Sequence, residues 1–306
     1  MKIAITGASG FIGHALRESL EPAGHQVASI SRSSPRAPAD IQWDPERGKL
    51  DAGLLEGFGA IIHLAGENIG QRWTPEIKKQ IRESRIRGTD LLARTIAGLR
   101  EPPAVLVSAS AVGIYGNRGD EILDESSPTG SDFLSGVVRD WEAAADPARE
   151  AGIRVVHPRF GVVLAADGGA LERLLTPFRL GIGGRIGSGE QWMSWLDRRD
   201  LIAVIHFLLD SRISGAVNAV SPNPVQNSEF TSTLGKVLNR PAVLPTPTLA
   251  LRLMFGEMAD ATLLAGQRVI PRRLLEEGFV FRYPMLQESL NSAIHGIQHS
   301  AGEQVE

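Results

Sequence analysis

The chain has 306 residues, of which 42% are hydrophobic and 22% charged, and its formal net charge is −3. This length suits one large α/β domain, or one domain with a smaller lobe, and the composition is that of an ordinary soluble globular protein. The absence of cysteine excludes disulfides, thiolate catalysis and cysteine-ligated zinc. With no long basic block and no apolar run long enough for a bilayer, we expect a cytoplasmic protein with no nucleic-acid or membrane partner.

Residues 1 to about 165 alternate short apolar runs with amphipathic stretches. Strands are expected at KIAITG, HQVASISRS, AIIHLAG, AVLVSAS and IRVVHPRFGVVL, and helices at GFIGHALRESLEPAG, residues 74–98 and residues 132–150. Strands and helices that take turns over short connections form parallel sheets with right-handed crossovers. The pattern therefore predicts an α/β fold with a Rossmann-type, doubly wound parallel sheet.

The alternation of short apolar runs and amphipathic stretches ends after Leu164. The segment GIGGRIGSGEQWMSW (181–195) is rich in glycine and tryptophan and predicts a loop and a hairpin. PNPVQNSEF (222–230) predicts a turn and a helix start, and residues 241–279 predict helices between prolines. We therefore expect a sheet domain over residues 1–165, to which some later segments return, and a smaller C-terminal substrate lobe over residues 166–306.

Three glycines stand between the first strand and the first helix. In ITGASGFIG, Gly7 permits a tight turn, Gly10 lets the backbone approach a pyrophosphate, and Gly13 allows the helix to pack closely on the strand. The N-terminus of the helix then faces the anion. The contacts to a dinucleotide expected in this motif are Gly7, Gly10, Phe11, Ile12 and Gly13.

The end of the second strand indicates which dinucleotide is bound. A protein that selects NAD places Asp or Glu there, about 20 residues after the glycines, to bind the ribose 2′-hydroxyl. Here the sequence is SISRSS, with Ser31 and Arg32 and no acid. A planar cation and a hydroxyl suit a 2′-phosphate. The sequence predicts NADP(H) as the cofactor, with an ordinary surface arginine as the alternative.

With TGASGFIG, HLAGENI, SASAVGIYG and PRFGVVL in this order, the chain resembles the extended short-chain dehydrogenase/reductases. It is similar to their atypical subfamily labelled nucleoside-diphosphate-sugar epimerases on the stretches LAGENIGQRWT, SRIRGT, DFLSGVVRDWEAA, DGGALERLLTPFRLGIGGRIGSGEQWMSW and GQRVIPRRLLEEGF. The resemblance covers nearly the whole chain, including a short C-terminal domain. It implies a small-molecule substrate such as a nucleotide sugar, and it allows a homodimer formed through helices that flank the sheet.

The resemblance also implies further contacts to the dinucleotide. The residues at these positions are Leu64, Ala65, Gly66, Gln80, Arg85, Ser108 and Val163. The first three would line the adenine and ribose side, and the last would reach the nicotinamide end. A solvated helix face is the alternative for Gln80 and Arg85.

The catalytic pattern of the family is incomplete in this chain. Ordinary members use a Ser or Thr to polarise a carbonyl, a Tyr to transfer the proton, and a Lys to tune that Tyr and hold the nicotinamide ribose. Ser110 matches the serine if one residue is inserted before Tyr115. The other two positions fall near Phe133 or Leu134 and at Val137, which offer no exchangeable proton and no charge. Ser110 and Tyr115 are the candidate catalytic residues, with a packed loop tyrosine as the alternative for Tyr115.

A substrate lid is expected in the glycine- and tryptophan-rich segment. Its candidate residues are Arg185, Gln191 and Trp192, because aromatic faces stack on sugars and planar rings. A small hydrophobic core is the alternative for Trp192 and the expected place of Trp195. Asp200 is expected to cap the following helix.

Other polar residues of the sequence are also candidates for chemistry. Glu67, Asn68 and Arg159 are further polar candidates, whereas His157 lies in an apolar run and is expected in the core. The sequence has no Ser–His–Asp arrangement at nucleophile-elbow spacing, and no metal site is expected.

Two functions remain open at this point. The first is an NADP(H)-dependent oxidoreductase or epimerase-like enzyme that acts on a small polar substrate. A tyrosine with no neighbouring lysine, near its reference pKa of about 10, is a poor base but a usable acid at neutral pH, which favours carbonyl reduction. The second is a non-catalytic protein in which NADP(H) binding controls shape or partner contact.

Overall fold

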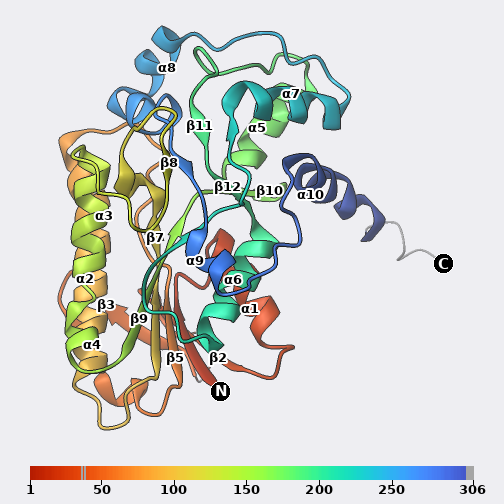
Figure 1. Ribbon diagram of the computed structural model, residues 1–306. Helices are drawn as coiled ribbons and strands as arrows, with labels where there is room; N and C mark the ends of the chain where they lie inside the picture. The colour runs from red at the N-terminus through yellow and green to blue at the C-terminus, as the bar shows by residue number, and fades with distance from the viewer. Residues whose placement is uncertain (36, 38, 301–306) are drawn as a thin grey trace. The chain divides into compact units, whose positions relative to one another are not determined.

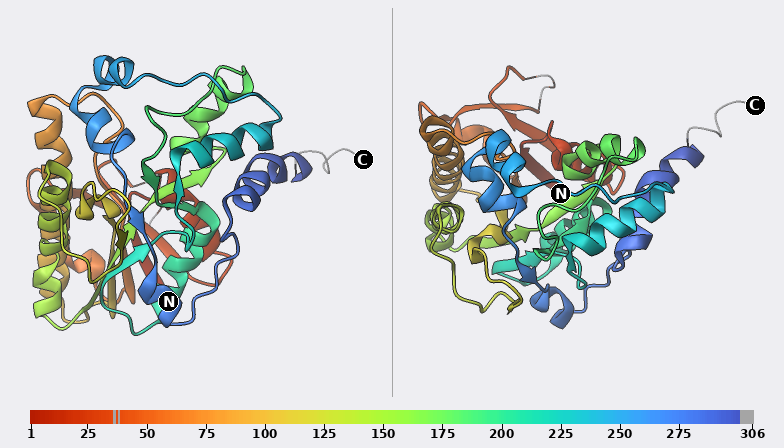
Figure 2. Two further views of the ribbon diagram at one scale, coloured as in Figure 1. Left: turned by 45° about the horizontal axis from the view of Figure 1, so that its top comes forward. Right: turned by 90° about the horizontal axis from the view of Figure 1, so that it is seen from above.

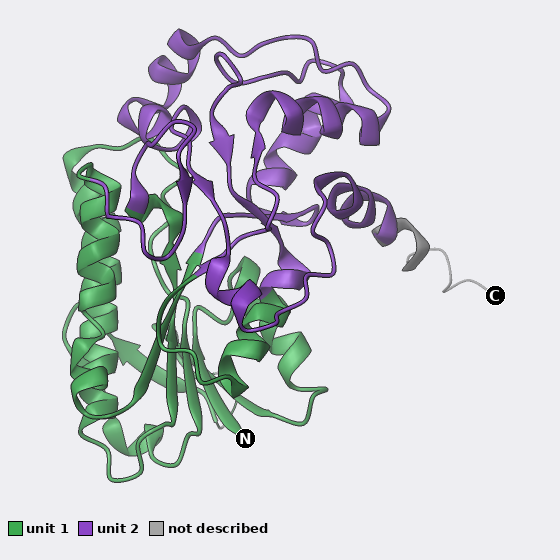
Figure 3. Ribbon diagram, viewed as in Figure 1, with its two compact units in different colours: residues 1–114, 131–159, 202–217 green, residues 115–130, 160–201, 218–306 purple. Residues whose placement is uncertain are grey.

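The computed structural model describes residues 1–35, 37 and 39–300, which form two compact units (Figure 3). Unit 1 contains residues 1–114, 131–159 and 202–217. Unit 2 contains residues 115–130, 160–201 and the described residues from 218 on. The chain thus passes between the units several times, and residues 202–217 return to the unit that holds the N-terminus.

Unit 1 is built around a parallel sheet. Its strands are β1 (Lys2–Thr6), β2 (Gln26–Ser31), β3 (Ile41–Asp44), β4 (Lys49–Leu50), β5 (Ala60–His63), β6 (Val105–Ser108), β7 (Ser110–Ala111), β9 (Arg154–Phe160) and β13 (Gly215–Ala219). Their order is β13-β9-β6-β5-β1-β2-β3-β4, with β7 beside β9. The pairs β2/β1, β1/β5, β5/β6 and β6/β9 are parallel, and β4 is antiparallel to β3. The predicted Rossmann-type doubly wound α/β fold is confirmed.

Helices cover both faces of this sheet (Figure 1). One face carries α2 (Pro75–Ala97), α3 (Phe133–Ala143) and α4 (Asp146–Glu150), and the other carries α1 (Phe11–Leu20) and α6 (Arg198–Asp210). The helix predicted over residues 74–98 is confirmed. The single helix predicted over residues 132–150 is wrong, because Pro147 lies in the first turn of α4 and cannot donate the hydrogen bond that would continue α3.

The core of unit 1 lies between the sheet and the α2 and α4 side. It contains buried side chains from β1, β2, β3, β5, β6 and β9 and from both helices, among them Ala4, Ile30, Ile41, Trp43, Ile61, Leu92, Ala93, Ile96, Leu106, Ala145, Ala148 and Val155. Strands buried on both faces read as continuous apolar runs, which is how AIIH and VLVS appear in the sequence.

Unit 2 combines short strands with helices. Its elements are β8 (Ile122–Leu123), β10 (Val162–Ala165), α5 (Gly169–Arg179), β11 (Trp192–Met193), β12 (Trp195–Asp197), β14 (Val225–Gln226), α7 (Asn227–Leu238), α8 (Thr248–Phe255), a π-helical turn (Ala259–Leu263), β15 (Arg268–Val269), α9 (Arg272–Glu276) and α10 (Leu286–Ser300). The helices predicted between the prolines of residues 241–279 are confirmed. Within the described residues, no helix is both long and apolar enough to cross a membrane.

The hairpin predicted in residues 181–195 is wrong. β11 pairs antiparallel with β14, and β12 pairs parallel with β10. Only Ser194 separates β11 from β12, whereas a hairpin needs a connection of about two residues or more. The two strands therefore find separate partners.

A second core holds unit 2 together. Trp195 is fully buried and donates from Nε1 to Asn223 O at 2.9 Å, so its predicted core position is confirmed. Apolar side chains of α5, α7 and α10 pack around it, and Figure 2 shows α7 and α10 side by side. At the start of α6, Asp197 rather than Asp200 accepts from the helix, through the Arg199 N–H at 2.9 Å. Asp200 instead accepts from the N–H groups of Arg282 and Tyr283.

Arg154, at the start of β9, fastens the returning segment 202–217 to the sheet of unit 1. Its guanidinium donates to Leu208 O and Ile213 O at 3.0 Å and to Leu209 O at 2.8 Å, which satisfies the open carbonyls at the end of α6. We expect Arg154→Met to lower the free energy of unfolding by about 2–4 kcal/mol, since three buried acceptors lose a charged donor. Urea unfolding measures this, with the exposed Arg212→Met as control. Equal stability of the two variants would contradict it.

Candidate functional site

The turn between β1 and α1 brings backbone segments of unit 1 close together. Gly7 has φ of 70°, and the Gly10 N–H donates to Gly7 O at 3.0 Å. A Cβ added to Gly13 would lie 2.2 Å from Gly7 O, which no side chain tolerates. Gly7 and Gly13 are therefore glycines for separate reasons, the first for its positive φ and the second for the approach of helix to strand.

The N-terminus of α1 is prepared for an anion. Gly10 is the N-cap residue and has no side chain with which to cap the helix, and the first turn contains no acidic residue. Phe11, Ile12 and Gly13 form this first turn, so their backbone N–H groups belong to the positive end of the helix dipole. The geometry suits a phosphate group.

Thr6, at the end of β1, joins this turn to the end of β5. Its Oγ1 accepts from the N–H groups of Leu64 at 3.0 Å and Ala65 at 3.1 Å, and it lies 2.7 Å from His63 Nδ1. Since both lone pairs of Oγ1 are used, the hydroxyl proton points to Nδ1, and the ring carries its own proton on Nε2. A Cβ on Gly7 would lie 3.1 Å from Ala65 N. The predicted residues Gly7, Leu64 and Ala65 thus meet at one edge of the sheet.

His63 is a neutral histidine in this arrangement. It is fully buried, its ring stands edge-on to Trp43 with centroids 5.9 Å apart, and within the described residues Nε2 has no hydrogen-bond partner. Burial, helped by the positive charge of Arg85, lowers the pKa of His63 to about 4. Sequence reasoning missed both Thr6 and His63, although a polar residue ending an apolar parallel strand is a usable signal.

Arg85 of α2 contacts the loop that follows β5. Its Nη1 donates to Glu67 O at 3.0 Å and to Ile81 O at 3.1 Å, and a Cβ on Gly66 would lie 3.3 Å from its Cζ. Burial lowers its pKa to about 10, so it stays charged at neutral pH. The structure gives Arg85 a place in the packing of this loop, while Gln80 lies exposed on the same helix.

The end of β2 presents an exposed cation. Arg32 is exposed, and within the described residues its guanidinium makes no hydrogen bond or ion pair. Ser31 donates from Oγ to Ser33 O at 3.1 Å. The nearest acid in the sequence, Asp40, accepts from the N–H groups of Ser29 and Ala37, both at 3.0 Å, so it closes the loop rather than facing a ribose. Among the residues that the structure describes, no hydrogen bond or ion pair joins a carboxylate to Arg32.

Buried polar groups follow β6. Ser110 donates from Oγ to Glu142 Oε1 at 2.5 Å, and Arg159 donates to both oxygens of that carboxylate at 2.8 and 2.9 Å. Burial disfavours the carboxylate, but the hydrogen bonds and charge of Arg159 outweigh it and hold the pKa of Glu142 below its usual value. Ser108 is also buried, and within the described residues its Oγ has no partner. Ser110 and Arg159 thus meet, through a glutamate that sequence reasoning did not single out.

The resemblance places the family's proton-transfer pair near Phe133 or Leu134 and at Val137, and these side chains are apolar and partly or fully buried. Phe133 opens α3 and stands edge-on to Trp73, with ring centroids 5.4 Å apart. Val137 is buried one turn later. His157 on β9 is buried, as predicted, with Nε2 3.4 Å from Arg149 Nη2. None of these side chains can exchange a proton at neutral pH, since burial lowers the pKa of His157 to about 4.

Tyr115 and Val163 belong to unit 2. Tyr115 is fully buried and donates from its hydroxyl to Asn218 Oδ1 at 2.7 Å. Asn218 in turn donates from Nδ2 to Ile270 O at 3.0 Å. Val163 is half-buried in β10, opposite Leu196 of β12. The tyrosine hydroxyl is therefore committed to a buried network, which matches the packed tyrosine weighed as its alternative.

The residues expected in a lid are held by their own unit. Gln191 donates from Nε2 to Ile186 O at 3.1 Å and to Leu263 O at 3.0 Å. Trp192 donates to Asp120 Oδ1 at 2.7 Å and carries the Arg268 guanidinium 4.2 Å above its ring. One face of the indole is thus already covered by a cation.

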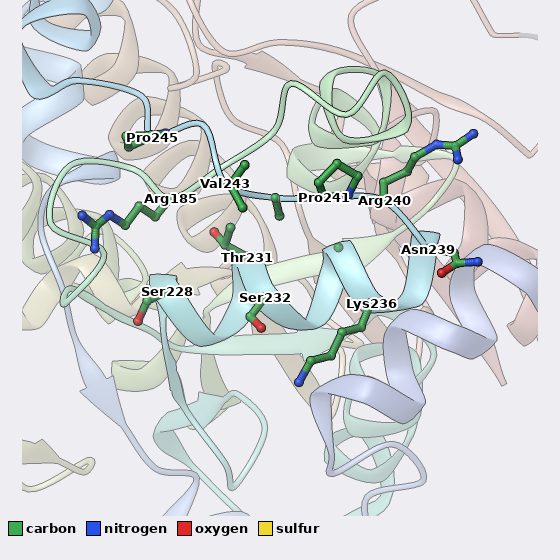
Figure 4. A pocket seen from close by; sticks show the side chains of 12 residues that line it. Arg185, Ser228, Thr231, Ser232, Lys236, Asn239, Arg240, Pro241, Val243 and Pro245 are labelled. Carbon is green, nitrogen blue, oxygen red and sulfur yellow. The ribbon is translucent and has the colours of Figure 1, made fainter.

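A pocket of about 710 Å³ lies in unit 2 between α7 and residues 239–245 (Figure 4). Arg185, Lys236 and Arg240 are charged residues of its lining, which contains no acid among the described residues. In Figure 4 the guanidinium groups of Arg185 and Arg240 point toward opposite ends of the groove. Arg240 also donates to Arg179 O at 3.0 Å. The cations lie around the rim and do not converge on one point.

Comparisons with known protein families give two matches along the chain. The sequence profile of the "NAD dependent epimerase/dehydratase family" matches residues 3–220, and that of a "Domain of unknown function (DUF1731)" matches residues 246–293. The chain is 42% identical over 293 residues to "Epimerase family protein Mb2239" of Mycobacterium bovis, covering 95% of this chain and 97% of that one.

Two crystal structures are similar to nearly the whole of this chain. The human epimerase family protein SDR39U1 (isoform 2) with NADPH superposes with a TM-score of 0.88 at 37% identity, covering 96% of this chain and 99% of the other. The nucleoside-diphosphate sugar epimerase from Corynebacterium glutamicum gives a TM-score of 0.80 at 36% identity, covering 100% of this chain and 62% of the other.

His63 makes the stability of the fold depend on pH. Because its pKa is about 4 in the folded chain and 6.5 when unperturbed, its contribution is present in full above pH 6.5 and is lost as the pH falls from there to about 4. The full loss is about 3 kcal/mol. We expect the free energy of unfolding of His63→Leu to fall less steeply over this pH window than that of the wild type. Parallel curves from denaturant unfolding at several pH values would contradict this.

Proposed function

The chain belongs to the NAD dependent epimerase/dehydratase family, and we propose that it binds NADPH and reduces a carbonyl group of a small polar substrate. One observation carries the proposal. The uncapped N-terminus of α1 and the exposed guanidinium of Arg32 lie after adjacent strands β1 and β2, at the carboxyl edge of a parallel sheet. Ligands of doubly wound folds bind at that edge.

The residues present fit this cofactor. The Cβ-free contact of Gly13 with Gly7 leaves backbone within reach of a pyrophosphate, and the first turn of α1 offers N–H donors with no competing acid. NADPH, when bound, supplies a hydride. The chain itself would bind the adenine end and orient the dinucleotide along the sheet edge. At that edge, His63 beside Thr6 is uncharged at neutral pH.

The preference for NADPH over NADH rests on Arg32. A guanidinium with no ion-pair partner in the described residues is available for a 2′-phosphate, and no carboxylate is positioned to bind a 2′-hydroxyl in its place. The human relative that crystallised with NADPH supports the same choice.

For the substrate we propose a nucleotide sugar or a similar small polar molecule. The C. glutamicum relative is described as a nucleoside-diphosphate sugar epimerase, which supports this class. Arg185, Gln191 and Trp192 stay predictions as lid residues, and so do the homodimer and the cytoplasmic location. With a net charge of −3 and no long basic block, we propose no nucleic-acid partner.

The arrangement favours slow chemistry. Ser110 already donates its proton to Glu142 and Tyr115 already donates to Asn218, so neither hydroxyl proton is available without breaking a buried hydrogen bond. Phe133 and Val137 add no acid or base. We therefore assign Ser110 and Tyr115 structural parts, and we propose that water protonates the product alkoxide.

A second candidate function follows from the same observation. Since the positions of the family's proton-transfer pair are apolar, the chain could bind NADPH and pass no hydride at all. In that case NADPH occupancy would control its shape or its contact with a partner. Turnover separates the two functions.

Arg32 should determine cofactor choice. We expect the wild type to bind NADPH about 10–100 times more tightly than NADH, and Arg32→Ala to lose that margin, as one charge-assisted pair is worth about 1.5–3 kcal/mol. Isothermal titration with both nucleotides measures the two affinities, and Arg47→Ala, an exposed arginine in the β3–β4 turn, is the matched control. A wild type that binds both nucleotides equally would refute the assignment.

Tyr115 should be dispensable for turnover. NADPH absorbance is followed under single-turnover conditions against a panel of nucleotide sugars, aldehydes and quinones. We expect Tyr115→Phe to oxidise NADPH at the wild-type rate while unfolding about 1 kcal/mol more easily, since it loses one buried hydrogen bond. A large drop in rate at unchanged NADPH affinity would make Tyr115 the acid. No oxidation by the wild type across the panel would favour the second function.

A further inference from the structure

Unit 1 brings a lysine to the place where the resemblance leads one to expect the family's tyrosine. Lys78 Nζ lies 4.4 Å from the centroid of the Phe133 ring. The lysine comes from α2 and the ring from α3, two helices on the same face of the sheet that pack against each other (Figure 1). A cation over an aromatic face is an attractive contact, so the ring steers the ammonium.

Local structure fixes both partners. Thr74 caps α2 by accepting from Ile77 N at 3.3 Å, which places Lys78 in the first turns of the helix. Trp73, just before the cap, is buried and donates from Nε1 to Ile69 O at 3.0 Å. Its ring stands edge-on against Phe133, so Phe133 is held between an indole and an ammonium.

The cap of α3 fixes the other side. Asp132 accepts from Ser135 N at 2.8 Å and from Ser135 Oγ at 2.9 Å, and Ser135 Oγ also lies 3.2 Å from Gly113 O. These hydrogen bonds tie the first turn of α3 to the segment that follows β7. Lys78 and Phe133 are both presented at N-terminal ends of helices, which in a parallel α/β sheet lie at the carboxyl edge of the strands.

The order of the strands gives the pair its position along that edge. From β2 the sheet continues through β1 and β5 to β6. Arg32 follows β2, the glycine turn follows β1, α2 with Lys78 follows β5, and α3 with Phe133 follows β6 and β7. A dinucleotide with its 2′-phosphate at Arg32 and its pyrophosphate at α1 has its nicotinamide half on the side of β5 and β6.

We propose that Lys78 binds the nicotinamide half of NADPH, as an ammonium supplied by α2 in a chain whose α3 carries no lysine. This inference rests on the proposed NADPH binding. An ammonium has three N–H donors on a flexible stem, and ribose hydroxyls and phosphate oxygens accept them. Phe133 is the positioning residue, since its ring directs the ammonium and offers no proton of its own.

The test compares two ligands that share only their adenine end. Adenosine 2′,5′-bisphosphate carries the adenosine and the 2′-phosphate but no nicotinamide half, whereas NADPH carries both. We expect Lys78→Met to weaken NADPH binding about tenfold, the value of one charge-assisted hydrogen bond, and to leave binding of the bisphosphate unchanged. Lys79→Met is the matched control, because Lys79 follows Lys78 on α2 but is exposed and lies beside Glu83. The Lys79→Met variant should bind both ligands as the wild type does.

Two further variants keep the outcome informative if Lys78→Met unfolds. Lys78→Arg retains the charge and should restore NADPH binding to within a few-fold of the wild type, while Phe133→Leu removes the ring and should weaken NADPH but not the bisphosphate. Equal NADPH affinities of wild type, Lys78→Met and Lys79→Met would overturn the inference. The contact between Lys78 and Phe133 would then have no part in binding NADPH. A parallel loss for both ligands would also overturn it. A wild type that binds neither ligand would instead refute the proposed function.

Discussion

The contact between Gly13 and Gly7 O is the constraint on which the rest of unit 1 depends. A side chain at Gly13 would place its Cβ 2.2 Å from that oxygen, so α1 can approach β1 only with glycine there. The close approach leaves the N-terminus of α1 without a side-chain cap and turned to the carboxyl edge of the sheet. It also brings Gly7 against Ala65, where Thr6 gathers the ends of β1 and β5. The uncapped N-terminus of α1 and the close packing of the sheet edge thus follow from one absent side chain.

The polar groups near that edge are mostly committed to structure. Thr6 is saturated by two N–H groups and a histidine, and Glu142 is saturated by Ser110 and Arg159. Leaving any of these buried partners unpaired would cost more than the hydrogen bond itself contributes, so they are poor donors to a reaction. This is why the site supports cofactor binding more strongly than rapid chemistry. Arg32 is exposed at the end of β2, and Lys78 is the cation for which we propose a contact with the nicotinamide half.

Sequence patterns predicted the parts of this protein that local rules determine. The glycine turn, the alternation of strands and helices, and the missing acid after β2 each depend on a few neighbouring residues. Pro147 also indicates the break between α3 and α4, but the helical pattern on both sides of it led to the prediction of one long helix. Pairing of β11 with β14 was not readable, because two-residue strands carry no periodicity.

Contacts between distant segments were the least predictable part of the site. Nothing near Lys78 in the sequence indicates that its ammonium lies over Phe133, because the two residues meet only when α2 and α3 pack on the same face of the sheet. Likewise, the sequence around Tyr115 does not show that its hydroxyl donates a hydrogen bond to Asn218, 103 residues later in the chain. Arg85 looked like a surface residue until the fold placed its guanidinium under the loop at Gly66. Burial and long-range partners decide such roles.

The claim that Arg32 and α1 together form the binding site for NADPH is tested most directly by ³¹P NMR of the bound nucleotide. A phosphate monoester has its second pKa near about 6, and a neighbouring guanidinium favours the dianion. We predict that binding lowers the pKa of the 2′-phosphate and shifts the pyrophosphate resonances in the same complex. A bound 2′-phosphate that titrates as it does in free NADPH would contradict the account.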